Sequence, residues 1–361
     1  MLSKEKRELI AIATIRVLRG RFESFPDDAS RNRNAPFHAA FLNAFSDKLR
    51  LAPEGLPYFV SLSSWFHGLN TTMGQTFFER VAHALSDGEK REFSPGELRI
   101  SQEQKHAISQ IMTELKNRRA KPNLVAENKR IFLGGISKLA EAEKFAVDNY
   151  AETSTTIEAI ELKTVRPNSG IAFGEKEKIL KAKAALWQMY PHKEIKFFLG
   201  FPFDPLSHTA TGSDKLRLME FLIEFDRYFD PAEVLVAEEL WDRLSGTTNT
   251  MQDVLDIINN IATPKFLEEY AFLMRAANRR QERTKYLTLL EKWCLSRELD
   301  LAKNDKEIED CCNEDKRIER IFHQPIFSHT SSILGEYNQG RVVKLLERLT
   351  QATTKSMFAK K

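Results

Sequence analysis

Apolar residues recur at helical spacing in three stretches of the first 120 residues. These stretches run over Lys4–Arg19, Thr76–Leu85 and Ser101–Arg119. In the third stretch, Ser101 and Gln104 stand at the spacing of a capping box. A cluster of Pro, Asp and Asn residues interrupts the pattern after the first stretch. The sequence therefore predicts that the chain begins with helices.

The middle of the chain changes to strand-like patterns. Lys144–Asp148 is a short apolar run and Thr156–Val165 is rich in β-branched residues, with the turn-like segment Glu152–Thr155 between them. This arrangement predicts a β-hairpin. A helix is expected next, over Gly174–Tyr190, followed by an apolar strand over Glu194–Phe203. The middle of the chain is therefore predicted to be mixed α/β.

Helical patterns dominate from Asp214 onward. The predicted helices cover residues 214–228, 231–244, 251–261 and 264–299. The highly charged segment 303–320 is expected to be either a mobile connection or an exposed helix, and the last twenty residues are amphipathic. These patterns divide the chain into an N-terminal helical segment (1–57), an α/β core (58–265) and a C-terminal helical region (266–361).

The predicted hairpin places three charged side chains in register. Because side chains alternate along a strand, Glu161 and Lys163 project from the same face. If Ser154 and Thr155 form the tip of a regular hairpin, Asp148 lies directly opposite Glu161. Opposed residues in an antiparallel pair have Cβ atoms roughly 4.5 to 5.5 Å apart, so these two carboxylates would repel each other without a cation.

The chemistry of this group is that of a magnesium-dependent hydrolase. Mg²⁺ binds one or two carboxylates, here Asp148 and Glu161, and accepts a backbone carbonyl such as that of Leu162. The ion polarises a scissile phosphate and activates a bound water, while Lys163 orients that water or offsets developing charge. The plainer interpretation, an ion pair between Glu161 and Lys163 on a solvated strand face, stays open at this point.

Basic residues gather downstream of the hairpin. Residues 166–183 hold five bases and two acids, and a helix start near Gly174 would add backbone N–H groups that favour phosphate. Arg275, Arg279 and Arg283 are also spaced as a stripe on the predicted long helix. The candidate DNA contacts are Arg166, Asn168, Lys176, Lys178, Lys181, Arg279 and Arg283.

Composition narrows the function classes further. The 361 residues carry a net charge of +3 at pH 7, which permits nucleic-acid binding if the positive charge gathers locally. Only three cysteines are present, so neither a disulfide framework nor a zinc knuckle is predicted. No signal peptide or membrane span is predicted, and we expect a cytoplasmic protein. No nucleotide cofactor is expected, because the sequence lacks G-x-x-x-x-G-K-[ST].

Two sequence strings resemble a known family. The string over Ile160–Asn168, followed by Gly174–Lys178, resembles the active-site region of PD-(D/E)XK type II restriction endonucleases, closest to the TdeIII-like group. The stretch Leu235–Asp242, with Leu244-Ser-Gly and Asp253–Ile257 after it, is similar to an "EExWDxLxG…LLDI" stretch of the same group. The resemblance covers roughly residues 140–260.

The resemblance implies a fold, a reaction and a set of site residues. It implies an α/β restriction-endonuclease-like core, a mixed central sheet flanked by helices, with helical N- and C-terminal additions. It also implies a homodimer that uses Mg²⁺ to cut double-stranded DNA at a short palindrome, with a GGNCC-like site suggested. Asp148 and Glu161 would be metal ligands and Lys163 the catalytic lysine. Val147 replaces the family's proline, so Glu143 is the fallback for Asp148, and Glu79 is an additional candidate acid.

Two rival functions remain at this stage. One is another nuclease of the same fold, acting in repair or in a mobile element. The other is a helical DNA-binding protein that binds without metal and does not cleave.

Overall fold

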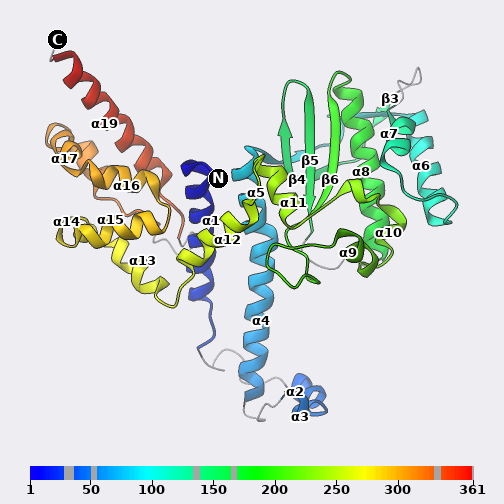
Figure 1. Ribbon diagram of the computed structural model, residues 1–361, viewed down its shortest axis with the longest axis horizontal. Coiled ribbons are helices and arrows are strands. Elements are labelled where there is room, and N and C mark those ends of the chain that lie inside the picture. The colour runs from blue at the N-terminus through cyan, green and yellow to red at the C-terminus, as the bar shows by residue number, and fades with distance from the viewer. Residues whose placement is uncertain (28–35, 50–54, 133–138, 164–168, 329–334, 360–361) are drawn as a thin grey trace. The chain divides into compact units, whose positions relative to one another are not determined.

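The computed structural model describes residues 1–27, 36–49, 55–132, 139–163, 169–328 and 335–359 (Figure 1). The chain divides into two compact units. Unit 1 comprises Met1–Leu2 and Phe78–Asp253, and unit 2 comprises Ser3–Phe77 and Val254–Lys361. Residues from both predicted helical segments, N-terminal and C-terminal, therefore belong to one compact unit.

Unit 1 is built on a five-stranded mixed sheet. The strands of the unit are β1 (Glu89–Phe93), β2 (Arg99–Ser101), β3 (Leu139–Glu141), β4 (Phe145–Glu152), β5 (Thr156–Leu162), β6 (Glu194–Phe201) and β7 (Val234–Val236). The sheet order is β1-β4-β5-β6-β7, and β2 pairs separately with β3. β4 runs antiparallel to both of its neighbours, β1 and β5, whereas β5, β6 and β7 are mutually parallel. The predicted mixed central sheet is confirmed.

The hairpin of β4 and β5 has the predicted register. Asn149 pairs with Ile160 and Glu152 pairs with Ile157, as expected for a tip at Ser154 and Thr155. The turn is closed by the N–H of Thr153, which donates to the carbonyl of Thr156 at 2.9 Å. The register thus brings Asp148 and Glu161 to the open end of the same two strands.

Helices cover both faces of this sheet. They are α5 (Phe78–Ser86), α6 (Gln102–Lys116), α7 (Leu124–Ile131), α8 (Ser169–Met189), α9 (Lys215–Phe221), α10 (Phe225–Tyr228) and α11 (Glu238–Ser245). α8 lies alongside β6, with α6 packed against α8 (Figure 1). The other face holds α11, whose Leu240 meets Ile160 and Leu162 beside Gly200. Because Gly200 lacks a Cβ, these three side chains close over it.

Two local features of unit 1 test the sequence predictions directly. The capping box at the start of α6 is confirmed, since the N–H of Gln104 donates to Ser101 Oγ at 3.1 Å and the N–H of Ser101 donates to Gln104 Oε1 at 3.0 Å. The predicted helix over residues 231–244 is wrong in its first half. A 3-10 turn, η3 (Pro231–Glu233), leads into β7, and α11 begins only after Ala237, which has a φ of 50°. The apolar run in β7 fits a buried strand as well as a helix, and pairing with β6 decides between them.

Unit 2 is helical. Its elements are α1 (Lys4–Glu23), α2 (Pro36–Asn43), α3 (Ser46–Leu49), α4 (Leu56–Thr72), the π-helix η2 (Met73–Phe77), α13 (Phe266–Met274), α14 (Asn278–Gln281), α15 (Arg283–Lys292), α16 (Ser296–Lys303), α17 (Asp305–Glu314), α18 (Lys316–Phe322) and α19 (Gln339–Ala359). α12 (Thr250–Ile261) spans the boundary between the units. The segment 303–320, left open by the sequence, is helical in α17 and α18.

The single helix predicted over residues 264–299 is wrong. The rings of Phe266 and Trp293 stack with centroids 5.5 Å apart. In one straight helix these residues would lie roughly 40 Å apart, because each residue adds about 1.5 Å. The segment instead folds into α13 to α16, with an extended residue at Arg275 and a positive φ at Cys294. Aromatic packing therefore overrides an uninterrupted helical pattern that contains no Gly or Pro after Pro264.

Among the helices of the described residues, none combines the length and the apolar character that crossing a membrane requires.

Candidate active site

Glu161 and Lys163 lie where β5 ends, on the face that α8 covers. The N–H of Lys163 donates to the carbonyl of Gly200 at 2.8 Å, which fixes the end of β5 against β6. Lys163 Nζ donates to Glu161 Oε1 at 2.9 Å, and α8 supplies a second acceptor, Glu175 Oε1, also at 2.9 Å. Both side chains are largely buried, with 10% of Glu161 and 21% of Lys163 exposed. The alternation predicted for this strand is therefore confirmed.

Asp148 reaches the same strand from across the hairpin. Its Oδ2 accepts a hydrogen bond from the N–H of Leu162 at 2.9 Å, so its carboxylate is tied to the residue between Glu161 and Lys163. Its backbone carbonyl lies 2.6 Å from His83 Nε2 on α5. Burial raises the pKa of the Asp148 carboxyl, and the negative charges of Glu161 and, less strongly, Glu79 raise it further. The surroundings of Asp148 therefore favour an added cation.

A lysine on the edge strand joins this group. Lys90 Nζ on β1 lies 3.6 Å from Asp148 Oδ1 and donates to both carboxylate oxygens of Glu79 at 3.1 Å. Glu79, on α5, thus approaches Asp148 through a shared cation. The sequence singled out Glu79 but missed Lys90, although the consecutive charged residues Glu89, Lys90 and Arg91 before Phe93 are typical of an edge strand.

Lys163 is held between two carboxylates. Burial alone lowers the pKa of Lys163, but the charges and hydrogen bonds of Glu161 and Glu175 outweigh burial and raise it above the ordinary lysine value. Lys178 on α8 adds a second cation, with Nζ 3.0 Å from Glu161 Oε1. Glu175 was counted in the sequence only as an acid of a basic segment. Its spacing of three residues from Lys178 on a helix after the Glu-x-Lys strand is the signal that could have found it.

The donor set fits a hydrated magnesium ion. Among the described residues, no group of three or more His, Cys, Asp and Glu side chains is arranged to hold a metal. Two carboxylates, Asp148 and Glu161, converge on the end of one hairpin. Mg²⁺ keeps several waters and needs only one or two carboxylates, whereas a structural zinc site needs four protein ligands. In the structure, Lys90, Lys163 and Lys178 supply the positive charge around these acids.

Lys176 is wrongly assigned as a DNA contact. Its side chain is fully buried, and Nζ lies 2.5 Å from Glu127 Oε2 and 2.6 Å from Glu233 Oε2. No phosphate can reach it there. The helix start predicted near Gly174 is also wrong, because α8 begins at Ser169 and the backbone of Gly174 lies inside the helix.

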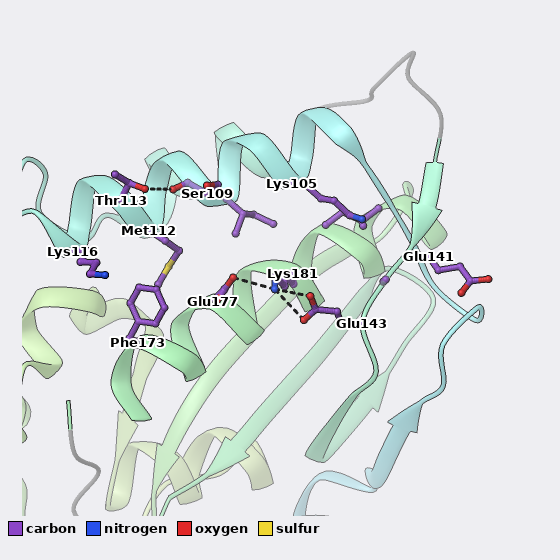
Figure 2. Close-up of a pocket in the computed structure, with 13 residues that line it drawn as sticks. Lys105, Ser109, Met112, Thr113, Lys116, Glu141, Glu143, Phe173, Glu177 and Lys181 are labelled. Carbon is purple, nitrogen blue, oxygen red and sulfur yellow. Dashed lines mark hydrogen bonds and ion pairs between the residues drawn. The ribbon is translucent and has the colours of Figure 1, made fainter. Parts of the chain in front are cut away.

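Lys181 and Glu143 form an ion pair with each other, outside the group of charges around Glu161. Lys181 Nζ is 2.9 Å from Glu143 Oε1 and 3.1 Å from Glu177 Oε1. Figure 2 shows these three side chains pointing toward one another at a cavity of about 370 Å³ between α6 and α8. The carboxylate of Glu143 therefore faces Lys181, and the acid that the structure ties to the Glu-x-Lys strand is Asp148.

The predicted arginine stripe does not exist as one helix face. Arg279 is buried, with Nε 2.7 Å from Asp305 Oδ1 and its guanidinium 3.7 Å from the centroid of the Phe322 ring. Its assignment as a DNA contact is wrong. Arg283, at the start of α15, is exposed and donates to the carbonyl of Lys303 at 3.3 Å. Arg166 and Asn168 lie outside the described residues.

The Trp-Asp stretch has a structural role. Trp241 is buried, and its Nε1–H donates to the carbonyl of Pro202 at 2.8 Å, which joins α11 to the end of β6. Asp242 Oδ1 accepts from the N–H of Thr250 at 2.8 Å and so caps α12. Gly246 ends α11 with a φ of 72°. The second string that resembles the family therefore joins β6, α11 and α12 to one another.

A mixed sheet flanked by helices, with converging acids and a lysine at the end of its central hairpin strand, defines a restriction-endonuclease-like α/β fold. Comparison with known proteins gives the family. Residues 2–262 match the family described as "Type II restriction endonuclease, HinfI". The chain belongs to the HinfI family of type II restriction endonucleases.

A curated relative extends this likeness to nearly the whole chain. The type II restriction enzyme MjaII of Methanocaldococcus jannaschii is 42% identical over 367 aligned positions, which cover 96% of this chain and 97% of that protein. No solved structure matches the chain. The family is that of a site-specific DNA nuclease, while the closer grouping with TdeIII-like enzymes stays a prediction.

Proposed function

We propose that this protein is a Mg²⁺-dependent type II endonuclease that hydrolyses phosphodiester bonds of duplex DNA at a short palindromic site, with a GGNCC-like sequence as the first candidate. One observation carries the proposal. The carboxylate of Asp148 accepts a hydrogen bond from the Leu162 N–H, next to Glu161, while Lys163 donates to Glu161 from the end of the same strand. The HinfI-family match and the likeness to MjaII support the same reaction class.

Each residue has a role in this proposal. Asp148 and Glu161 hold the ion, and the carbonyl of Leu162 is available as a further oxygen ligand. The bound ion would polarise the scissile phosphate and lower the pKa of a bound water. Lys163 keeps its proton at neutral pH, since its pKa is raised, and its ammonium orients that water or offsets charge that develops on the phosphate. Glu79 is a candidate for an additional acid.

DNA contacts and assembly extend the proposal. Lys178 and Lys181 on α8 and Arg283 on α15 remain candidates for phosphate contacts, as do Arg166 and Asn168. A palindromic site has two-fold symmetry, and each chain carries one such set of acids. We therefore expect a homodimer with one active site per strand.

The test is cleavage of plasmid DNA by the purified chain with Mg²⁺. We expect discrete fragments, loss of cleavage with EDTA, and a fall of about 10²- to 10³-fold for Lys163→Ala, the size of losing one electrostatic contact to a transition state. Glu161→Ala should also be inactive while DNA binding persists. Glu158→Ala is the matched control, because Glu158 lies on the same strand but pairs with Arg243 on the opposite face.

The outcomes separate the rival functions. Smeared products, or nicking confined to branched DNA, would favour a repair or mobile-element nuclease of the same fold. DNA binding that needs no metal and never leads to cleavage would favour a non-catalytic DNA-binding protein. Undiminished cutting by both active-site variants would refute the assigned residues.

A further inference from the structure

Four charged side chains form a closed ring at the active site, and only two of them belong to the Glu-x-Lys strand. Lys163 bridges Glu161 and Glu175 at 2.9 Å each. Lys178 bridges the same two acids from the other side, 3.0 Å from Glu161 Oε1 and 3.7 Å from Glu175 Oε2. Acid and base therefore alternate around the ring, with two members on β5 and two on α8.

The two carboxylates of the ring differ in how their oxygens contact the lysines. Glu161 Oε1 is the atom that approaches both lysines, so the same oxygen neutralises two cations. Glu175 places one oxygen on Lys163, while its other oxygen, Oε2, is buried without a hydrogen bond among the described residues. Glu175 Oε2 can therefore accept a further hydrogen bond, whereas Glu161 Oε1 already approaches two ammonium groups.

This imbalance matters when Glu161 takes up a cation. A divalent ion on the Glu161 carboxylate weakens its hold on both ammonium groups, because the ion and the lysines compete for the same negative charge. Lys163 would then lose one of its two partners. Glu175 is positioned to keep it, since its bond to Lys163 is as short as that of Glu161 and its second oxygen, 3.7 Å from Lys178 Nζ, makes no hydrogen bond among the described residues.

We infer that Glu175 is a positioning residue, which holds the Lys163 ammonium in the active site and lets Glu161 exchange Lys163 for the metal ion. The inference rests on the proposed function and adds a helix-borne acid to it. A Glu175→Gln substitution keeps the shape but removes the charge. Lys163 then depends on Glu161 alone, and the ion must displace a stronger ion pair.

The experiment measures metal binding and cleavage separately. Mn²⁺ is titrated into the DNA-free protein and free Mn²⁺ is followed by electron paramagnetic resonance. Glu175→Gln should weaken Mn²⁺ binding by about 10- to 100-fold, the usual effect of losing a group that orients a metal site. In plasmid cleavage it should lower kcat by a similar factor and change KM much less.

Controls separate positioning from folding. Glu177→Gln is the matched control, because Glu177 lies two positions along α8 and pairs with Lys181 outside the ring. It should bind Mn²⁺ and cleave like the wild type. Glu175→Asp keeps the charge and should recover part of both losses. A purely structural role would instead lower thermal stability in Glu175→Gln and leave Mn²⁺ affinity per folded molecule unchanged.

The results that would overturn the inference differ from those that would overturn the proposed function. A wild type that never cleaves DNA with Mg²⁺ refutes both. A wild type that cleaves, while Glu175→Gln matches it in Mn²⁺ affinity and kcat, refutes only the role of Glu175. A wild type that cleaves but binds no Mn²⁺ without DNA also refutes it, because the exchange at Glu161 is inferred for the protein alone.

Discussion

Two buried lysines of α8 allow a direct test of what holds the sheet and its covering helix together. Lys176 and Lys183 are both fully buried. Lys176 makes two short ion pairs, 2.5 Å to Glu127 and 2.6 Å to Glu233. The nearest carboxylate oxygen that pairs with Lys183 is 3.9 Å away, on Glu233, and Lys183 Nζ makes no hydrogen bond among the described residues. The two positions share burial and differ in pairing.

Methionine is the matched replacement at both positions, because it is close to lysine in volume and leaves little cavity. Lys176→Met removes the cation shared by two buried carboxylates, one on α7 and one on η3. Breaking a buried pair by removing one partner costs about 3–5 kcal/mol, since the remaining charge stays buried and uncompensated. Lys183→Met removes a desolvated charge with little pairing. We expect it to change the free energy of unfolding by less than about 1 kcal/mol, or to stabilise the protein.

The assay is urea unfolding at pH 7, followed by far-ultraviolet circular dichroism and by the fluorescence of variants that keep only the unit 1 tryptophans, Trp187 and Trp241, with Trp65 and Trp293 replaced by Phe. If the free energy of unfolding falls with urea concentration at the wild-type slope, both variants expose as much surface on unfolding as the wild type does. Equal losses at the two positions would refute the reasoning, because burial alone, and not pairing, would then decide the cost. A loss confined to Lys183→Met would refute it more strongly.

Two further predictions follow from pKa shifts. Asp148→Asn should abolish cleavage yet raise the free energy of unfolding by roughly 0.5–2 kcal/mol at pH 7, and that gain should shrink toward pH 4, since the raised pKa means that the folded state disfavours the Asp148 carboxylate. An unchanged or lower stability in urea would contradict it. Burial lowers the pKa of Lys183 to about 8 from 10.5, so the folded state releases this proton first and stability should rise with pH across that window. The free energy of unfolding of the wild type should therefore rise relative to that of Lys183→Met from pH 8 to pH 10. A constant difference between the two proteins would count against this prediction.

The hairpin was predictable because its information is local. Alternation assigns Glu161 and Lys163 to one face, and the turn at Ser154-Thr155 fixes the register that brings Asp148 to the same end. A change of one residue in the turn would have reversed the faces. The sequence therefore contained enough to place the acids, although β1 and the Lys90 that it carries were not recognised.

The helix α8 shows what local information cannot decide. Lys176 and Lys178 are two positions apart, and on a helix of 3.6 residues per turn this separates them by about 200°. One side chain consequently lies in the interior and the other at Glu161. The sequence counted both as bases beside the active strand. Which face of α8 meets the sheet depends on packing with α6, α7 and β6, which no pattern within the helix reveals.

The two ionic groups on α8 also explain why this helix carries so many charges in a buried setting. Glu175 and Lys176 are neighbours in sequence, yet Glu175 pairs with Lys163 at the end of β5 while Lys176 joins Glu127 and Glu233 in the interior. An apolar helix of the same length would bury well, but it could slide or rotate against β5 with little penalty. Short ion pairs on both sides of α8 restrict rotation, because any turn that favours one group breaks the other. The buried charges thus set the distance between a helix-borne acid and the lysine at the end of β5.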